Sequence, residues 1–429
     1  MIGLFFQDES MKLNFSCYPE LLFMDATYKL NELRIPVYIL LVEDSLGLSE
    51  VVGVALLVNE TKESISWLIN SFAKNNETKN LRTVMADKDI NERNRISEIL
   101  HVPTLICLFH ALKSFKRELA ALKLNAKLRD EAKTLFQKMC FANTKEDFIS
   151  LEKQFLALDS SPLVEYYKEH WQPISCEWVK CFKAQKGHFL NSTNNRLESF
   201  NGKLKSVIGF KSSLEEFVRG FFVVLESLRT ERNQVVANEF LKVRPFTTED
   251  KNIKAIRNHL TVYAADYVCE ELAALKQSKV QQSTITACDC CFATSMRLPC
   301  RHIFLSRFQA KCEDLFVEDL CDERWSKAYC QKSHRLFNGS HLSSALGNKL
   351  SCSTTSKRPV KDLNHNERYR NTAGICSKLS SLAAEVGGET FNARINTLKM
   401  LQSIWEKGGE ARILSMGKIV LSDSLLDIN

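Results

Sequence analysis

A short cysteine-rich stretch, CDCCFATSMRLPCRH, constrains this chain more than any other feature. It contains Cys288 and Cys290, then nine residues, then Cys300 and His302. Thiolates and imidazole are the ligands that Zn²⁺ prefers, and four of them complete a tetrahedral structural site. The spacing therefore predicts one zinc ion that orders this segment, which is too small to hold a core of its own. The alternative is a chance grouping in a cysteine-rich chain, and the adjacent Cys291 offers a substitute ligand.

The composition favours a soluble protein of a reducing compartment. The 429 residues suffice for two or three domains, and the 45% hydrophobic and 25% charged fractions are ordinary for globular proteins. Most of the 15 cysteines are scattered through apolar or helical stretches, which favours free thiols over a disulfide framework. The N-terminus lacks a signal-peptide pattern, and no apolar run is long enough to span a bilayer. The net charge of +7 suits a nucleic-acid partner.

The N-terminal part of the chain alternates between strand and helix patterns. Apolar, β-branched runs predict strands at 21–24, 37–42, 51–58, 81–86 and 104–109. Amphipathic spacing predicts helices at 63–72 and 91–100. The second and third strands are expected to form a hairpin. The resulting order of strand, strand, strand, helix, strand, helix, strand is that of the ribonuclease-H-like fold.

Helical patterns dominate the rest of the chain. The block from Ala111 to about Phe182 has no glycine and predicts an all-α insertion. Further helices are predicted at 212–229, where Ser213 and Glu216 form a capping box, and at 251–275.

The C-terminal part is predicted to contain a linker and a helical pair. Residues 331–371 are rich in Ser, Lys, Asn and Arg and poor in apolar residues, which is typical of a mobile linker. A helical pair is expected from about Ile375 to Trp405, broken near Gly387 and Gly388.

Three carboxylates occupy positions from which they can converge. Asp25 and Asp87 each follow a predicted strand, and Glu198 lies at a predicted helix start. Adjacent strands lie about 4.8 Å apart, so strand-end carboxylates can meet at one edge of a sheet. Three carboxylates can hold two divalent cations, preferably Mg²⁺ or Mn²⁺, about 3.5–4 Å apart for phosphodiester chemistry. Ordinary solvated carboxylates in turns and caps are the alternative.

The sequence motifs around these carboxylates resemble those of a known family. DATYKLN, MADKD, the pair Cys107 and His110 in CLFH, and NNRLESFNGKLK are similar to motifs of Mutator-like element (MULE) transposases and occur in that family's order. The cysteine spacing resembles the SWIM-type zinc finger. The closest likeness is to the transposase-derived SWIM zinc-finger proteins of animals, with plant far-red-response factors more distant. The resemblance covers most of residues 1–330.

The resemblance implies an α/β ribonuclease-H-like domain with an all-α insertion, followed by helices, a small SWIM zinc finger and a C-terminal helical pair. Carried over by position, Asp25, Asp87 and Glu198 would be the acidic triad, which would bind Mg or Mn. Cys107 and His110 would match the family's C-x-x-H element, with His110 at a strand end near the acidic centre. The expected domains are a ribonuclease-H-like domain (1–230, insertion about 111–182), a helical connector (231–283), the zinc finger region (284–330), a linker (331–371) and a C-terminal helical segment (372–429).

The expected function is that of a nuclear, zinc-containing, transposase-derived protein that binds DNA and cleaves and joins DNA strands. Basic residues near the triad would contact phosphates, or else form an ordinary solvated face: Lys113, Lys116, Arg117, Arg196, Lys203 and Lys205. The first alternative is a domesticated, catalytically inactive nuclear factor that binds DNA or protein through the finger. A second alternative makes the finger a protein-docking module, and no membrane partner is expected.

One departure from the family bears on target recognition. Related proteins usually carry an N-terminal DNA-reading domain, whereas the predicted strands here begin close to the first residue. A truncated gene model, a decayed element and a domesticated fragment would each account for this. Site-specific recognition of transposon ends is therefore not expected from these motifs alone.

Overall fold

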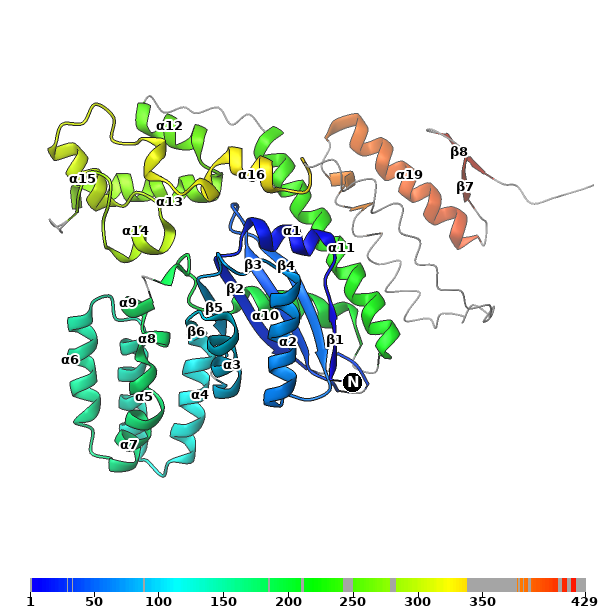
Figure 1. Cartoon of the computed structure of the whole chain (residues 1–429). Coiled ribbons are helices and arrows are strands. Elements are labelled where there is room, and N and C mark those ends of the chain that lie inside the picture. The colour runs from blue at the N-terminus through cyan, green and yellow to red at the C-terminus, as the bar shows by residue number, and fades with distance from the viewer. Residues whose placement is uncertain are drawn as a thin grey trace, which may run out of the picture. The chain divides into compact units, whose positions relative to one another are not determined.

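The structure is a computed structural model of the chain, which forms two compact units, residues 1–348 and 349–429 (Figure 1). It describes residues 2–28, 30–32, 34–87, 89–183, 186–209, 212–241, 250–277, 283–337 and 387–407, with 376, 379–380, 382–384 and the strands 411–414 and 418–421.

A mixed sheet forms the centre of the first unit, with the strand order β1-β4-β3-β2-β5-β6. Neighbours from β1 through β2 pair antiparallel, whereas β2, β5 and β6 run parallel. The strands are β1 (Gly3–Phe6), β2 (Leu21–Thr27), β3 (Val37–Glu43), β4 (Ser49–Leu57), β5 (Thr83–Ala86) and β6 (Thr104–Ile106). The predicted strands and hairpin are present, and β1 is an edge strand that the sequence patterns did not predict.

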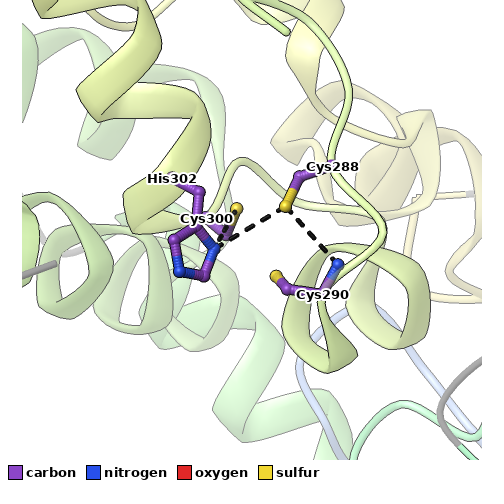
Figure 2. Close-up of side chains that lie close together, drawn as sticks. All are labelled: Cys288, Cys290, Cys300 and His302. Atoms are coloured by element: carbon purple, nitrogen blue, oxygen red, sulfur yellow. Dashed lines mark hydrogen bonds between the residues drawn. The ribbon is translucent and has the colours of Figure 1, made fainter. Parts of the chain in front are cut away.

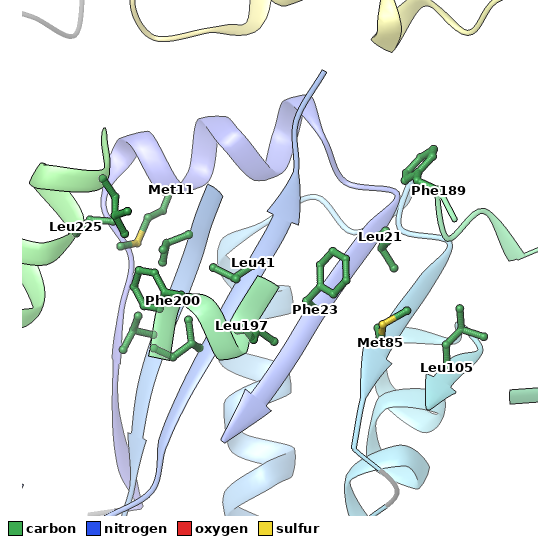
Figure 3. Close-up of a cluster of buried hydrophobic side chains, with 14 of the residues drawn as sticks. Met11, Leu21, Phe23, Leu41, Met85, Leu105, Phe189, Leu197, Phe200 and Leu225 are labelled. Carbon is green, nitrogen blue, oxygen red and sulfur yellow. The ribbon is translucent and has the colours of Figure 1, made fainter. Parts of the chain in front are cut away.

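Helices cover both faces of this sheet. They are α1 (Glu9–Cys17), α2 (Lys62–Asn75), α3 (Ile90–Leu100), α10 (Asn195–Val207) and α11 (Leu214–Leu241). Alternate strand residues point to opposite faces. Leu21 and Phe23 of β2 therefore share a core with α10 and α11, whereas Leu22 and Met24 share one with α2 and α3 (Figure 3). Asp25 follows the alternation of Phe23 and belongs to the α10 face.

The predicted all-α insertion is present and has a core of its own. Its helices are α4 (Leu108–Ala121), α5 (Ala126–Cys140), α6 (Lys145–Leu156), α7 (Ser161–His170), α8 (Ser175–Trp178) and α9 (Lys180–Lys183). Phe136 stacks on Phe115 and on Trp178 at centroid distances of 3.9 and 4.8 Å, and Trp171 meets it edge-on. Such aromatic packing lets a small helical layer stand beside the sheet without adding to its core.

The cysteine-rich region folds against the end of the sheet. Its helices are α12 (Lys251–His259), α13 (Val262–Ala273), α14 (Cys291–Met296), α15 (Arg301–Gln309) and α16 (Lys327–Ser333). Met296, Phe304 and Trp325 belong to the same hydrophobic cluster as Leu21 and Phe23 of the sheet. The cysteine-rich region and the sheet therefore share one core.

Arg324 fastens this region to the sheet. Its side chain is 3% exposed and donates hydrogen bonds to the Glu20 carboxylate and the Glu43 carbonyl at 3.0 and 2.6 Å. The guanidinium carbon lies 3.9 Å from the centre of the Phe189 ring and 4.6 Å from that of Trp325. A buried cation is held here by charge-assisted hydrogen bonds and by two aromatic faces.

The helix predicted at 251–275 is interrupted, because α12 ends at His259 and α13 begins at Val262. Thr261 causes the break. Its hydroxyl accepts from the backbone N–H of Ala264 as an N-cap and donates to the Ser45 carbonyl at 2.8 Å. By contrast, Ser213 and Glu216 form the predicted capping box, each side chain accepting from the other's backbone N–H.

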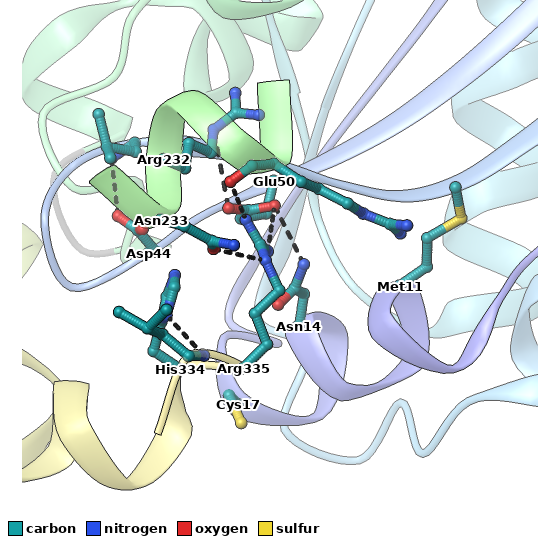
Figure 4. A network of polar contacts seen from close by, with 12 residues as sticks. Met11, Asn14, Cys17, Asp44, Glu50, Arg232, Asn233, His334 and Arg335 are labelled. Carbon is teal, nitrogen blue, oxygen red and sulfur yellow. Dashed lines mark hydrogen bonds and ion pairs between the residues drawn. The ribbon is translucent and has the colours of Figure 1, made fainter. Parts of the chain in front are cut away.

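A buried polar network joins the chain just after α16 to the sheet (Figure 4). Glu50 of β4 is 2% exposed, forms ion pairs with Arg335 at 3.2 Å and Arg232 at 3.7 Å, and accepts from Asn14 at 3.1 Å. Ser333 and His334 are buried, and α16 continues to Ser333, so the linker prediction was wrong for the start of this segment. Residues 338–371 of the predicted linker lie outside the described residues.

The second unit contains the helix α19 (Gly388–Glu406) and a hairpin of β7 (Ala411–Leu414) and β8 (Lys418–Leu421). The helix α19 begins at the predicted break near Gly387 and Gly388. Most of the other predicted C-terminal helix lies outside the described residues, and the hairpin was not predicted.

Candidate metal centres

Asp25 and Asp87 lie side by side at one edge of the sheet. The parallel pairing of β2 with β5 sets Leu21 opposite Thr83 and Phe23 opposite Met85. The same register, continued by two residues, sets Asp25 opposite Asp87. Asp25 was predicted to lie at a strand end, but β2 continues past it to Thr27. Asp87 directly follows β5.

Glu198 lies on α10, the helix that packs on the Phe23 face of the sheet. It occupies the first turn of the helix, and its charge acts on Asp25 together with that of Asp87. Burial is the main cause that raises the pKa of Asp25 to about 6, and the two neighbouring carboxylates add to it, against the opposing effect of His110. The three predicted acids therefore interact electrostatically despite their distance in sequence.

The strand predicted at 104–109 ends at Ile106, and α4 begins at Leu108. Cys107 starts the helix, because its N–H donates to the Ala86 carbonyl while its own carbonyl accepts from Ala111. His110 was predicted to lie at a strand end, but it is in a helical turn. Its Nδ1 still lies 3.8 Å from an oxygen of Asp87. Contact with Cys107 and the charge of Asp87 raise the pKa of His110 to about 9, against burial.

Two further carboxylates at this edge were missed by the sequence patterns. Glu92 of α3 is 4% exposed, and burial together with the charges of Asp25 and Asp87 raises its pKa well above the usual range. Glu60 accepts hydrogen bonds from the hydroxyls of Tyr28 at 2.8 Å and Tyr38 at 2.9 Å. Glu92 follows Asp87 by five residues in a stretch that resembles the solvated start of a helix, so only the tertiary structure identifies it.

The basic residues that were predicted to contact phosphates are either exposed or paired with carboxylates. Lys113, Lys116 and Arg117 are exposed on α4, the helix that carries His110. Arg196 was predicted to contact phosphates, but it is bound to Glu43 at 2.8 Å and to the Gly47 carbonyl at 2.6 Å.

Two further basic residues of α10 follow the same division. Lys203 pairs with Glu231 at 3.0 Å, whereas Lys205 is exposed. The exposed predicted cations therefore lie mainly on α4, where Arg117 also contacts Glu118 at 3.4 Å.

The four predicted zinc ligands gather at one point (Figure 2). Among the described residues, only Cys288, Cys290, Cys300 and His302 bring three or more ligand atoms within 4.8 Å of one another. The Nδ1 of His302 lies 3.6 Å from the sulfurs of both Cys288 and Cys300. Tetrahedral zinc, with Zn–S near 2.3 Å and Zn–N near 2.0–2.1 Å, requires S···N separations of about 3.6 Å. The cluster therefore fits zinc.

Local structure prepares these sulfurs for a cation. Cys290 caps α14, and its sulfur accepts from the backbone N–H of Ala293 at 3.5 Å. Contact with the Cys300 thiol lowers the pKa of Cys290 to about 5, and the same contact raises the pKa of Cys300. A thiolate is the form that binds metal. Cys291, the substitute ligand considered above, is not in the cluster.

Comparisons with known proteins find relatives of part of this chain. Residues 1–105 match the family model described as the RNaseH-like domain of zinc finger SWIM domain-containing protein 1/3. The chain is also similar to Protein FAR-RED IMPAIRED RESPONSE 1 of Arabidopsis thaliana, with 23% identity over 238 residues. Over residues 1–105 the chain is therefore similar to the RNaseH-like domain of the SWIM zinc-finger proteins.

The N-terminal domain is confirmed as ribonuclease-H-like. The match ends at residue 105, before Glu198 and the cysteine cluster. The plant relative aligns with 54% of this chain, and this chain spans 28% of that protein's length. No helix among the described residues combines the length and the apolar character needed to cross a membrane.

Proposed function

We propose that this protein binds DNA in the nucleus and cleaves its strands with divalent cations held by Asp25, Asp87 and Glu198. The proposal is supported by the position of Asp25 opposite Asp87 on paired strands and by the charge of Glu198, which acts on Asp25. Their neighbour His110, 3.8 Å from Asp87, supplies a partial counter-charge.

The donor set suits two hard cations. The carboxylate oxygens are the ligands that Mg²⁺ and Mn²⁺ prefer. They are not gathered as tightly as the cysteine cluster, whose ligand atoms lie within 4.8 Å. The two ions of such a pair lie about 3.5–4 Å apart and share their carboxylate ligands. When bound, such a pair stabilises charge on the entering and leaving oxygens of a phosphodiester.

The helix α4 provides the surface for DNA. It starts at the acidic edge and exposes Lys113, Lys116 and Arg117 along its length. Phe109, in its first turn, is 46% exposed, and the Lys113 ammonium lies 5.9 Å from the centre of its ring. Cations can contact phosphates, and an exposed aromatic ring can stack on an unpaired base. A DNA strand along α4 would bring its backbone to Asp87.

The zinc site has a structural role in this proposal. Arg301, between Cys300 and His302, donates to the Glu271 carboxylate of α13 at 3.0 Å through its Nε. The hydroxyl of Ser295 in α14 accepts from the backbone N–H of Leu190, in the loop before α10, at 3.0 Å. A metal held by the four ligands would fix these contacts and hence the approach to Glu198.

A nicking assay on supercoiled plasmid tests the proposal. The wild type is expected to nick with Mg²⁺ or Mn²⁺ and not in the presence of EDTA, whereas Asp87→Asn should lose nicking and retain salt-sensitive DNA binding. Asp130→Asn, which changes an exposed aspartate of α5, is the matched control and should nick normally. Equal nicking by wild type and Asp87→Asn would assign the activity to another source. DNA binding without nicking in either metal would reduce the function to binding alone.

A further inference from the structure

The helix α11 is the longest of the described helices, and it presents two neighbouring apolar side chains to solvent near its middle. Phe222 is 37% exposed and Val223 is 59% exposed, whereas Phe221 and Val224 beside them are buried in the core that α11 shares with the sheet. Exposed apolar surface that is rimmed by polar side chains is typical of an interaction site. The solvent-facing side of α11 is therefore a candidate for association.

Opposite charges flank this apolar pair at equal distances along the helix. Arg219 precedes Phe222 by three residues, and Glu226 follows Val223 by three residues. Both charged side chains face solvent, with exposed fractions of 76% for Arg219 and 63% for Glu226. Helix residues that are three or four positions apart lie on the same face. One exposed face of α11 therefore presents a cation, an apolar pair and an anion in that order.

This order of side chains is complementary to itself. In a two-fold symmetric pair of antiparallel helices, positions at equal distances on either side of the axis face each other. With the axis between Phe222 and Val223, Arg219 of each copy faces Glu226 of the other, and Phe222 faces Val223. Two identical ion pairs then surround an apolar centre. A parallel pair would instead set like charges against each other, which is unfavourable.

The contacts that these charges make within the chain do not prevent such pairing. Arg219 contacts Glu215 at 3.0 Å, but both side chains are more than 75% exposed, and exposed ion pairs contribute at most about 1 kcal/mol. Glu226 accepts a hydrogen bond from Arg229 at 2.7 Å. Arg229 also donates to both carboxylate oxygens of Asp8, at 2.9 and 2.8 Å, and would remain paired without Glu226.

We propose that two copies of this protein associate through their α11 helices, packed antiparallel about a two-fold axis between Phe222 and Val223. The two helices would overlap from Leu214, where α11 begins, to Glu231. Helices in contact lie about 8–10 Å apart, which brings Arg219 within reach of Glu226 of the other copy. One pair of helices buries less surface than an obligate dimer, so the association is weak and reversible. This inference is independent of the proposed DNA cleavage.

Sedimentation equilibrium of the zinc-loaded full-length protein over a range of concentrations tests the association. The wild type is expected to show a monomer–dimer equilibrium. Val223→Asp should remain monomeric over the same concentrations, because dimerisation would bury a charge without a partner. Val235→Asp is the matched control, since Val235 is 42% exposed on the same helix but lies beyond the overlap. This control should dimerise as the wild type does.

Exchanging the two charges tests the antiparallel arrangement. Arg219→Glu and Glu226→Arg each replace two attractive pairs by two repulsive ones, and each should weaken dimerisation at least about tenfold. The double variant with both substitutions restores opposite charges across the axis. Its dimerisation constant should return to within about threefold of the wild-type value.

Three results would overturn the proposal. The first is a wild type that stays monomeric at every concentration, and the second is a dimer that Val223→Asp leaves intact. The third is a double variant that dimerises no better than the two single charge reversals. A thermal melt shows whether each variant is folded. If Val223→Asp is not, the charge reversals still decide the question, because they change only exposed side chains.

Discussion

The Cys107 sulfur accepts a hydrogen bond from the backbone N–H of Asn194 at 3.1 Å. Cys107 starts α4, which carries His110, and Asn194 caps α10, which carries Glu198. A second bond, from the Leu108 N–H to the Ser192 carbonyl at 2.9 Å, runs beside the first. The cysteine of the C-x-x-H element therefore connects two helices at the acidic edge, which a buried thiol can do without contacting a metal.

Cys107→Ala should loosen this connection. The buried N–H of Asn194 would lose its acceptor at a cost of about 1–3 kcal/mol in the free energy of unfolding, and Glu198 would be less well placed, so Mn²⁺ affinity should fall. Urea unfolding and Mn²⁺ titration measure both effects. Cys140→Ala removes an equally buried thiol from α5 and should lower stability while leaving Mn²⁺ affinity unchanged. Unchanged affinity in Cys107→Ala would show that the bond has no role at the site.

Cys300→Ser should remove zinc, because a hydroxyl does not replace a thiolate ligand in a structural site. The melting temperature should fall as well, since the loss would release the contacts of Ser295 and Arg301 with Leu190 and Glu271. Elemental analysis and a thermal melt provide the measurements. Cys291→Ser changes the adjacent cysteine outside the cluster and should retain zinc. A zinc content in Cys300→Ser equal to that of the wild type would refute the ligand assignment.

DNA binding should depend on α4. Each of Lys113→Gln and Lys116→Gln is expected to weaken DNA binding and to reduce the slope of log affinity against log salt by about one. Fluorescence anisotropy at several salt concentrations measures the slope. Lys203→Gln serves as the control, because Lys203 is already paired with Glu231 and should affect binding less. Equal effects of all three substitutions would indicate a diffuse charge effect and not a surface on α4.

Stability should fall as the pH rises from about 4 to about 7 because of Asp44. Burial, with the charge of Glu50 adding to it, raises the pKa of Asp44 to about 7 from an ordinary value of 3.8. A raised pKa in the folded state means that the contribution is fully present below about pH 4 and lost as the pH passes 7. The total loss is on the order of 4 kcal/mol, at about 1.4 kcal/mol per pKa unit.

Asp44→Asn isolates this effect. The amide oxygen can still accept from the backbone N–H groups of Leu46 and Leu48, which Asp44 holds at 2.9 and 2.7 Å. The variant should match the wild type near pH 4 and exceed its unfolding free energy above pH 7. Taking the difference between the two proteins cancels the opposite contribution of His334, whose pKa is lowered to about 4 mainly by burial. A difference that does not change with pH would exclude Asp44 as the cause.

The parts of the fold that depend on local pattern could be predicted from the sequence. The hairpin of β3 and β4 and the capping box at Ser213 follow from residues close in sequence. The approach of Asp25 and Asp87 was also predictable, because equivalent positions on paired strands meet. The short strand β1 was not, since four apolar residues carry too weak a signal.

The remaining differences arise from contacts distant in sequence. Thr261 interrupts a helical pattern because it donates hydrogen bonds to the carbonyls of Ser45 and Trp325. The sequence around Arg196 is typical of a solvated cation, but Arg196 forms an ion pair with Glu43, which is distant in the sequence. Glu92 has the sequence context of a surface residue, and only the packing of α3 against the sheet buries it. None of these partners can be identified from a local window of residues.

The shared core of the sheet and the cysteine-rich region also limits how this protein could have evolved. Trp325 is fully buried in the cluster that contains Phe23, and its indole N–H donates to the Met296 carbonyl at 2.7 Å. A recombination breakpoint between the two regions would expose this aromatic surface on both products. The cysteine-rich region and the ribonuclease-H-like domain are therefore expected to be inherited together, because neither covers this surface alone.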